Sequence, residues 1–367
     1  MIQDTLLFFF LTATAIQLFY WLFIFSRLAF YRQPLPPPGP AEPVSIIICA
    51  RNEEKNLRRN LPYFLAQDFP EYEVIVVNDN SSDKTLEVLL DFQKKSPILR
   101  LIDVTVNTPR GKKAALSKGI KAAKFEIVLL SDADCRPSSP QWLDFTQAFI
   151  RDRAKIGLGY SPYFRGKGIL NAFIRFETVY SAIQYLSFAL MGLPYMGVGR
   201  NLAYRKSLFR GSGGFDSHAH IASGDDDLFI NQVATRANTR VILSPKAFVF
   251  SEPKSSWRGY YRQKSRHLTT GTRYRLVHQL ALGLLSASHF GHYACGIALI
   301  LFHNLELTVF INYLARIAVA SALYMLIMRK LHDTSLIRWV PLLDVLYAVS
   351  YLVFAPALFL KPKEKWK

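Results

Sequence analysis

The stretch LLSDADCRPSS, residues 129–139, decides the expected fold. It continues the apolar run FEIVLL (125–130), which is typical of a buried strand, and it places Asp132 and Asp134 one residue apart directly after that run. Two carboxylates this close repel and raise each other's pKa, so we expect a positive group between them or full solvation. The stretch therefore predicts a strand that ends at a charged site.

Short apolar runs alternate with helical patterns around this stretch. We expect strands at 44–50, 73–77, 99–103 and 125–130, and helices at 53–67, 82–95 and 111–123. The alternation predicts an α/β fold with a mostly parallel, Rossmann-like sheet and helices on both faces. Ligands bind such sheets beyond the carboxyl ends of the strands, and polar segments follow three of the predicted strands. These segments are RNEE (51–54), NDNSSD (78–83) and SDAD (131–134).

The N-terminal part of the chain is apolar. Residues 6–25 carry no charge and are long enough to span a bilayer. A signal peptide is the alternative, but the start MIQD lacks a basic region and no small-residue cleavage site follows. We therefore expect a retained transmembrane anchor over 1–30. Arg27 and Arg32 place the next segment in the cytosol by the positive-inside rule, and residues 31–43 are a stiff Pro-rich linker.

The C-terminal part contains three further apolar stretches, at about 280–302, 308–328 and 339–360. The last holds Asp344 and two prolines, so it can cross the membrane, re-enter it or lie at its surface. Residues 280–367 are thus predicted as a membrane region of two or three helices with a basic tail. We expect an integral protein of a bacterial inner (plasma) membrane with its central domain in the cytosol.

Composition excludes several classes. Lys and Arg outnumber Asp and Glu by 45 to 27, and the resulting charge of +18 suits nucleic acid, anionic lipid or an anionic substrate. The basic residues gather beside apolar segments and no nucleic-acid-binding module is present, so a nucleic-acid partner is not expected. The three cysteines are far apart and show no CxxC spacing, which argues against a zinc site or a disulfide framework.

The chemistry of the strand ends differs from that of a dinucleotide-binding fold. The chain has no GxGxxG after its first strand and no GxxxxGK[ST] motif. Asp79 can accept hydrogen bonds from a base or a ribose. Asp132 and Asp134 would repel a diphosphate unless a divalent cation lay between them, and ligands that are all oxygen favour Mg²⁺ or Mn²⁺. Solvated acids at a strand end are the alternative for this tripeptide taken alone.

Taken together, the motifs resemble glycosyltransferase family 2, which has the GT-A fold. The resemblance covers roughly residues 44–270 and is specific as a set. The stretches that carry it are SIIICARNEEKNLRRNL, VIVVNDNSSDKT, GKKAALSKGI, LLSDADCRPS, GVGRNLAYRKSLF, GGFD, SGDDDLFINQV and YRQKSRHL. It implies a GT-A domain over 44–250, a nucleotide-sugar donor, usually a UDP-sugar, and inversion at the anomeric carbon.

The resemblance also implies roles for individual residues. The implied donor-binding residues are Ala50, Arg51, Glu53, Asp79, Lys112, Asp132, Gln263 and Arg266, and the implied metal ligands are Asp132 and Asp134. The chain departs from the family pattern at three positions. Asn78 and Gly224 stand where acids are common, and His267 replaces the tryptophan of the QxxRW motif, which puts sugar stacking on that residue in doubt.

Asp225 and Asp226 are the candidate catalytic residues. Sugar transfer needs a carboxylate, separate from the metal pair, that deprotonates the acceptor hydroxyl. Three adjacent acids, Asp225 to Asp227, follow a glycine and precede an apolar helix, and their repulsion would raise the pKa of one of them. Capping of the helix by the acids is the alternative. Both roles can hold, with Asp225 facing the acceptor and Asp226 or Asp227 capping the helix.

Residues 251–279 mix aromatic with basic side chains, as helices at a membrane surface do. They include QKSRH (263–267), where Gln263 and Arg266 share a helix face, and Arg266 can pair with a diphosphate. We expect an inverting glycosyltransferase that acts at the cytosolic face on a lipid, lipid-linked or glycan acceptor. The alternatives are a processive polysaccharide synthase and a non-catalytic protein that binds the membrane surface.

Overall fold

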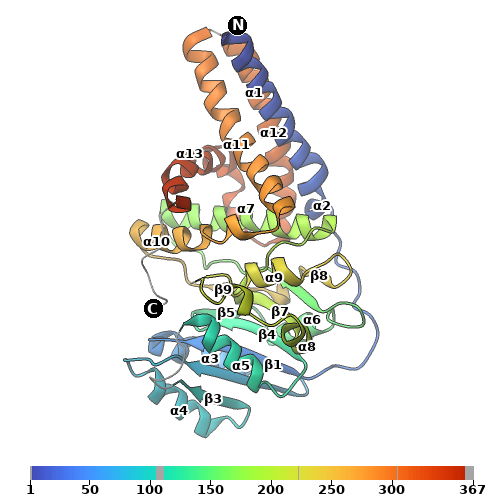
Figure 1. The fold of residues 1–367 in the computed structure, drawn as a ribbon, viewed down its shortest axis with the longest axis vertical. Coiled ribbons are helices and arrows are strands. Elements are labelled where there is room, and N and C mark those ends of the chain that lie inside the picture. The colour runs from blue at the N-terminus through green and yellow to red at the C-terminus, as the bar shows by residue number, and fades with distance from the viewer. Residues whose placement is uncertain (1, 105–110, 222, 304, 360–367) are drawn as a thin grey trace. The chain divides into compact units, whose positions relative to one another are not determined.

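The computed structural model of the protein describes residues 2–104, 111–221, 223–303 and 305–359 (Figure 1). Within them the chain forms two compact units. The sheet unit contains residues 33–166 and 192–254, and the helical unit contains residues 2–32, 167–191 and 255–359. The predicted range 44–250 therefore includes a segment, 167–191, that groups with the helical unit. The predicted basic tail lies outside the described residues.

A seven-stranded sheet forms the centre of the sheet unit, with the order β3-β2-β1-β4-β7-β6-β8. Its strands are β1 (Val44–Ala50), β2 (Tyr72–Asn78), β3 (Leu99–Asp103), β4 (Ile127–Asp132), β6 (Ile156–Gly159), β7 (Leu202–Arg205) and β8 (Thr239–Ile242). Strands β1 to β4 are parallel, as predicted, whereas β7 runs antiparallel to both β4 and β6. A second, two-stranded sheet pairs β5 (Cys135–Pro137) with β9 (Val249–Ser251).

Strand β1 is buried along its whole length because it lies between β2 and β4. This position explains its mostly apolar sequence, VSIIICA, which matches the predicted range 44–50. The register pairs Ala50 with Asn78 on one side and Cys49 with Asp132 on the other. The carboxyl ends of β1, β2 and β4 therefore meet at one edge, where the polar segments follow.

Helices cover the sheet. Those of the sheet unit are α3 (Glu54–Leu65), α4 (Thr85–Lys95), α5 (Lys112–Ala122), α6 (Trp142–Gln147), α8 (Lys206–Gly211) and α9 (Asp227–Val233). Helix α5 packs closely on the sheet because Gly119 has no side chain: a Cβ there would lie 2.6 Å from Cγ2 of Ile47. This close packing fixes the first residue of α5, Lys112, at the edge where the strands end.

The Pro-rich linker is held against the sheet unit. The Arg151 guanidinium donates to the backbone carbonyls of Pro37, Gly39 and Pro40, and Arg205 pairs with Glu42 at 2.8 Å. Residues 31–43 contain no helix or strand, as the composition predicts.

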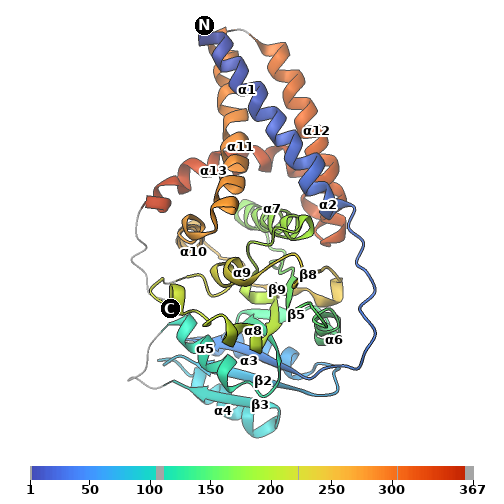
Figure 2. The ribbon, with the colours of Figure 1, turned by 45° about the vertical axis from the view of Figure 1, so that its right-hand side comes forward.

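In its described residues the helical unit contains a continuous N-terminal helix and five further α-helices. They are α1 (Ile2–Phe19) with its continuation through the π-helix Tyr20–Phe25 into α2 (Ser26–Ala29), then α7 (Ile169–Met191), α10 (Trp257–Leu268), α11 (Leu276–His303), α12 (Glu306–Lys330) and α13 (Val340–Phe359). Four segments are long and apolar enough to cross a membrane: Ile2–Ala29, Leu276–Phe302, Glu306–Lys330 and Thr334–Ala357. Figures 1 and 2 show α1, α11 and α12 running side by side, whereas α13 lies across them.

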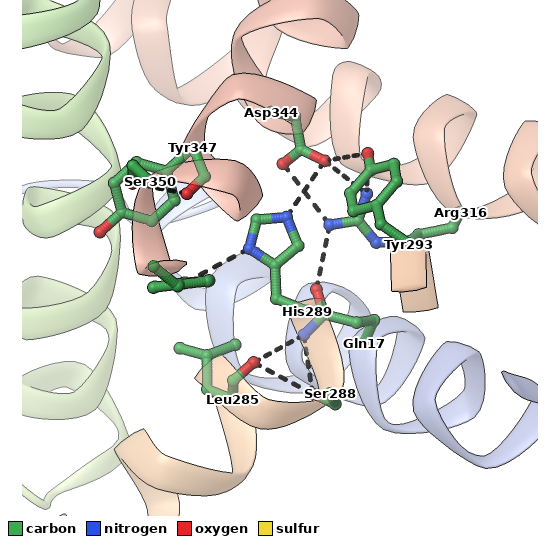
Figure 3. Close-up of polar contacts among 10 residues, drawn as sticks. Gln17, Leu285, Ser288, His289, Tyr293, Arg316, Asp344, Tyr347 and Ser350 are labelled. Atoms are coloured by element: carbon green, nitrogen blue, oxygen red, sulfur yellow. Dashed lines mark hydrogen bonds and ion pairs between the residues drawn. The ribbon is translucent and has the colours of Figure 1, made fainter. Parts of the chain in front are cut away.

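A buried polar cluster ties α13 to the other helices. Figure 3 shows the Asp344 carboxylate between Arg316 of α12 and the His289 ring of α11. Arg316 Nη1 lies 2.6 Å from Asp344 Oδ2, and both side chains are 1% exposed. Tyr293 donates its hydroxyl to Asp344 at 2.6 Å, and Arg316 also donates to Gln17 of α1 at 3.1 Å. Residues of α11 and α12 thus satisfy one buried carboxylate of α13, and Gln17 of α1 bonds to the arginine of the pair.

Candidate active site

The ends of β1 and β2 form a preorganised corner around Asp79. The Asp79 N–H donates to the Ala50 carbonyl at 2.9 Å, which holds the two strand ends together. The Asp79 side chain is 1% exposed, and its Oδ2 accepts from the Gly111 N–H at 3.3 Å. Its Oδ1 has no hydrogen-bond partner within the described residues. A buried carboxylate oxygen without a partner is costly, so this corner is suited to a ligand that donates a hydrogen bond.

The loop after β1 is fastened to the loop after β2. Asn52, in the left-handed region at φ 55°, donates its N–H to the Ser81 hydroxyl at 3.0 Å, and the Glu53 N–H donates to the Thr85 hydroxyl at 2.8 Å. Burial, together with the charges of Asp134 and Asp132, raises the pKa of Glu53 to about 7. These contacts place Glu53 near the acid pair, while Arg51 is partly exposed beside it.

Asp132 ends β4, and Asp134 follows in the turn to β5. Oxygens of the two carboxylates and the Cys135 sulfur lie within 4.8 Å of one another. The Cys135 thiol donates a hydrogen bond to Asp134 Oδ1 at 3.3 Å. Cys135 is therefore a protonated thiol beside the carboxylate and not a thiolate ligand. Two carboxylates at this spacing fit a hard cation such as Mg²⁺ or Mn²⁺, whereas a single thiol does not make a soft-metal site.

Lys112 joins this pair to the downstream acids. Its Nζ lies 3.0 Å from Asp132 Oδ1 and 3.0 Å from Asp225 Oδ2. Burial alone would lower the pKa of Lys112, but Asp132 and Asp225 raise it above its ordinary value, so the group stays charged. One ammonium therefore compensates two carboxylates that lie 93 positions apart in the sequence.

The acid cluster at the start of α9 separates into different environments. Asp226 is the N-cap of α9: its Oδ1 accepts from the Asp227 N–H and its Oδ2 from the Gly199 N–H, both at 2.8 Å. Burial and the charges of Asp225 and Asp227 raise the pKa of Asp226 to about 7. Burial acts in the same direction on Asp225, but Lys112 outweighs it and lowers the pKa of Asp225.

The sequence reasoning did not single out Arg200. This residue lies in the short 3₁₀ turn Gly199–Asn201, and its guanidinium carbon is 4.3 Å from the centroid of the Tyr163 ring. The turn is pinned on both sides, because Ser131 donates to the Arg200 carbonyl at 3.1 Å and Gly199 donates to Asp226. The charge of Arg200 opposes the rise in the pKa of Asp134 that burial and Asp132 cause. A lone arginine in GVGRN carries no sequence signal that would have revealed this.

Most of the predicted site residues thus gather at one edge of the sheet, namely Ala50, Glu53, Asp79, Lys112, Asp132, Asp134, Asp225 and Asp226. Gln263 and Arg266 lie on α10 of the helical unit, three positions apart on the helix. Their contact with a donor stays a prediction. Within α10, Lys264 forms an ion pair with Glu177 of α7.

Comparison with known proteins identifies the domain. Residues 45–211 match the sequence profile of the family described as "Glycosyl transferase family 2". The chain contains a glycosyltransferase family 2 domain. The sheet unit is accordingly its GT-A catalytic domain, and the acid-rich strand ends are the candidate active site of a glycosyltransferase.

Two curated relatives and one solved structure are similar to this chain. A "Probable glycosyltransferase YdaM" of Bacillus subtilis (strain 168) is 28% identical over 251 residues, which is 65% of this chain and 57% of that protein. A "Poly-beta-1,6-N-acetyl-D-glucosamine synthase" of Staphylococcus epidermidis is 41% identical over 93 residues, which is 25% of this chain and 22% of that protein. The chain thus matches less than two thirds of the length of each relative.

The solved structure is a mannosyltransferase from Pyrobaculum calidifontis, determined in complex with GDP-Man and Mn²⁺. It superposes with a TM-score of 0.63 at 18% identity, and the match covers 95% of this chain and 99% of that one. At this identity the likeness concerns the fold, and it agrees with the GT-A architecture described above.

Proposed function

We propose that this protein is an inverting glycosyltransferase that moves a sugar from a nucleotide-sugar donor, in the UDP-sugar class, to a lipid or lipid-linked acceptor at the cytosolic face of the membrane. The observation that carries the proposal is the arrangement around Lys112. The acid pair Asp132 and Asp134, which suits a divalent cation, and the separate carboxylate Asp225 face one site from different segments.

The nucleoside and the diphosphate of the donor each have a counterpart in this site. The partner-free Oδ1 of Asp79 suits the N–H of a pyrimidine imide or a ribose hydroxyl. A Mg²⁺ or Mn²⁺ ion held by Asp132 and Asp134 would neutralise the diphosphate as charge develops on it. Arg200, whose Nη2 donates only weakly to the Ser161 carbonyl at 3.3 Å, can offer further N–H groups to the same phosphates.

The chemical step follows from these positions. The acceptor oxygen attacks the anomeric carbon, the bond from that carbon to the donor phosphate breaks, and the nucleoside diphosphate leaves. Asp225 takes the proton of the acceptor hydroxyl, because its carboxylate is ionised and lies apart from the metal pair. Attack from the face opposite the leaving diphosphate inverts the configuration of the sugar.

The helical unit supports a membrane-bound acceptor and a cytosolic site. Lys330 at the end of α12 bonds to the Tyr31 carbonyl, so the basic residues that follow α2 and end α12 gather at one end of the bundle. The positive-inside rule places that end in the cytosol, from which the chain enters the catalytic domain at Gln33. With α13 lying across the bundle, α1, α11 and α12 are the three crossings.

A processive polysaccharide synthase remains the second candidate, and the similarity to the Staphylococcus epidermidis enzyme is the observation that favours it. Such an enzyme needs a polar path for its chain. The buried Gln17, Tyr293, Arg316 and Asp344 side chains of α1, α11, α12 and α13 are instead engaged with one another. This internal pairing favours transfer of a single sugar.

The acceptor can be tested with purified protein in detergent, a radiolabelled UDP-sugar, Mn²⁺ and a bacterial lipid extract. We expect label to enter the organic phase in a product that is one sugar larger than its acceptor, as measured by mass spectrometry. A water-soluble product with a ladder of chain lengths would favour the synthase instead. Omitting the lipid extract is the control, and label that enters the organic phase without it would contradict the proposal.

A further inference from the structure

A cavity of about 660 Å³ lies among the membrane helices. Its walls come from α1, α11, α12 and α13, and most of them are apolar. The apolar lining residues that the argument uses are Phe10, Ile297, Ile300, Leu307 and Phe310. The volume lies within the range of about 300–1,000 Å³ that is usual for small-molecule sites. Leu307 and Phe310 are largely exposed, so the cavity opens on the outer surface of the helices, where a bilayer supplies lipid.

His292 and Tyr293 also line the cavity, but the polar atoms His292 Nδ1 and Tyr293 Oη are engaged elsewhere. The Thr14 hydroxyl donates to the Phe10 carbonyl, so the His292 Nδ1–H donates to the Thr14 oxygen at 2.8 Å. Tyr293 donates its hydroxyl to Asp344, as Figure 3 shows. The His292 ring stacks on Phe10 with a centroid distance of 5.2 Å. The cavity therefore presents the rings of these residues, and it suits hydrocarbon rather than a polar ligand.

One charged side chain stands at the cavity. Glu306 lines it from the first turn of α12 and is exposed. The sequence contains no Lys or Arg between positions 1 and 26 or between 276 and 315, so the segments around Glu306 offer no such counter-ion. A cation brought by the ligand would complement Glu306.

We infer that the cavity binds one acyl chain of a phospholipid whose primary ammonium head group pairs with Glu306. The rings of Phe10 and His292 close the inner wall, and the chain lies along Ile297, Ile300 and Phe310. Because the walls come from four helices, a bound chain fills space that those helices would otherwise leave open in the bundle. The site is separate from the catalytic carboxylates and does not depend on the identity of the donor or acceptor.

Native mass spectrometry of the full chain in detergent tests this inference. Phosphatidylethanolamine and phosphatidylglycerol with identical acyl chains are titrated separately. We expect one saturable adduct with phosphatidylethanolamine and an affinity for phosphatidylglycerol that is weaker by about two- to fivefold, as for an exposed ion pair. Equal affinities in the unmodified protein, or a series of adducts without saturation, would overturn the inference.

Matched variants locate the adduct. Ile300→Trp fills the cavity from a residue that is 40% exposed, and it should abolish the adduct. Leu301→Trp introduces the same side chain at a position that is 69% exposed on the same helix and outside the cavity lining, and it should retain the adduct. Leu307→Trp repeats the filling from α12 should Ile300→Trp fail to fold. Glu306→Gln should bind both lipids equally. Loss of the adduct in Leu301→Trp, or its persistence in both filled variants, would contradict the site.

Discussion

Replacing Asp225 by asparagine should lower the rate of sugar transfer by about 10²–10⁴-fold, the usual contribution of a general base. The substitution keeps the size of the side chain and removes the proton acceptor. Donor affinity should change little, because this carboxylate acts on the acceptor and is not a member of the metal pair. Single-turnover transfer and donor binding, both measured on the purified variant, give the two quantities separately.

Asp226→Asn is the matched control. It is informative because Asp226 is the neighbouring acid that could also act as the base. A general base works best with a pKa near the working pH, and it is Asp226 whose pKa is raised to about 7. Both oxygens of Asp226, however, already accept backbone N–H groups, which leaves little capacity for an acceptor hydroxyl. We therefore expect Asp226→Asn to cost about 1–3 kcal/mol of stability, as for a buried polar group left unpaired, with a smaller loss of transfer rate.

The pH dependence of the transfer rate shows, without any mutation, whether Asp225 or Asp226 is the general base. Because Lys112 holds the pKa of Asp225 below its ordinary value, Asp225 is ionised throughout the neutral range. With saturating donor, the single-turnover rate should then stay flat between about pH 6 and about pH 8 if Asp225 is the base. A rate that rises about tenfold per pH unit below pH 7 and levels off above it would assign the base to Asp226.

Removing the charge of Asp344 should destabilise the membrane helices by about 3–5 kcal/mol, because it leaves the Arg316 guanidinium buried without its partner. Both side chains are 1% exposed, so water cannot replace the lost carboxylate. The variant Asp344→Leu in detergent should therefore unfold at a much lower temperature than the unmodified protein. Thermal unfolding followed by intrinsic tryptophan fluorescence measures the difference.

The double variant Arg316→Met/Asp344→Leu separates the charge from the position. It removes both charges and leaves apolar side chains of similar size, so it should recover most of the stability that the single variant loses. The double variant still leaves Tyr293 and His289 without their carboxylate partner, which explains why recovery is not expected to be complete. A double variant as unstable as Asp344→Leu would contradict this account of the cluster.

The local features of the sheet could be predicted from the sequence because they depend on short apolar runs. Strands β1 and β3 have the predicted bounds, since runs of apolar and β-branched residues are bounded there by polar turns. The antiparallel direction of β7 could not be predicted. Its four residues, LAYR, form a strand only because they pair with β4 and β6, which lie far away in the sequence.

Helix α7 was also absent from the predicted elements. Most of its 23 residues are apolar, with aromatic side chains on several faces, and its few polar residues do not form one polar face that would mark a helical period. Within the helical unit it is held by side chains that are distant in sequence, such as Asp333 on Arg175 and Lys264 on Glu177. These partners stabilise the long buried helix, but they cannot be predicted from the local sequence of α7.

The acids of the site could be predicted as a set, but the different role of each acid could not. Three consecutive residues at a helix start point in different directions, and the backbone before them decides which one faces the site. Gly224 has a φ of 97°, in the region that favours glycine, and a Cβ there would lie 2.5 Å from Leu228. This turn directs Asp225 to Lys112 and Asp226 to the helix N-cap. The Lys112 bridge itself joins residues from three distant segments.

The central claim is that Asp132 and Asp134 bind a divalent cation that carries a nucleotide sugar. The most direct measurement is release of nucleoside diphosphate from a panel of nucleotide sugars, by detergent-purified protein with lipid extract, in Mg²⁺, in Mn²⁺ and in excess chelator. The account predicts turnover of at least one donor with a cation, none in chelator, recovery when the cation is restored, and none for Asp134→Asn. Full turnover in excess chelator, or by Asp134→Asn, would contradict it.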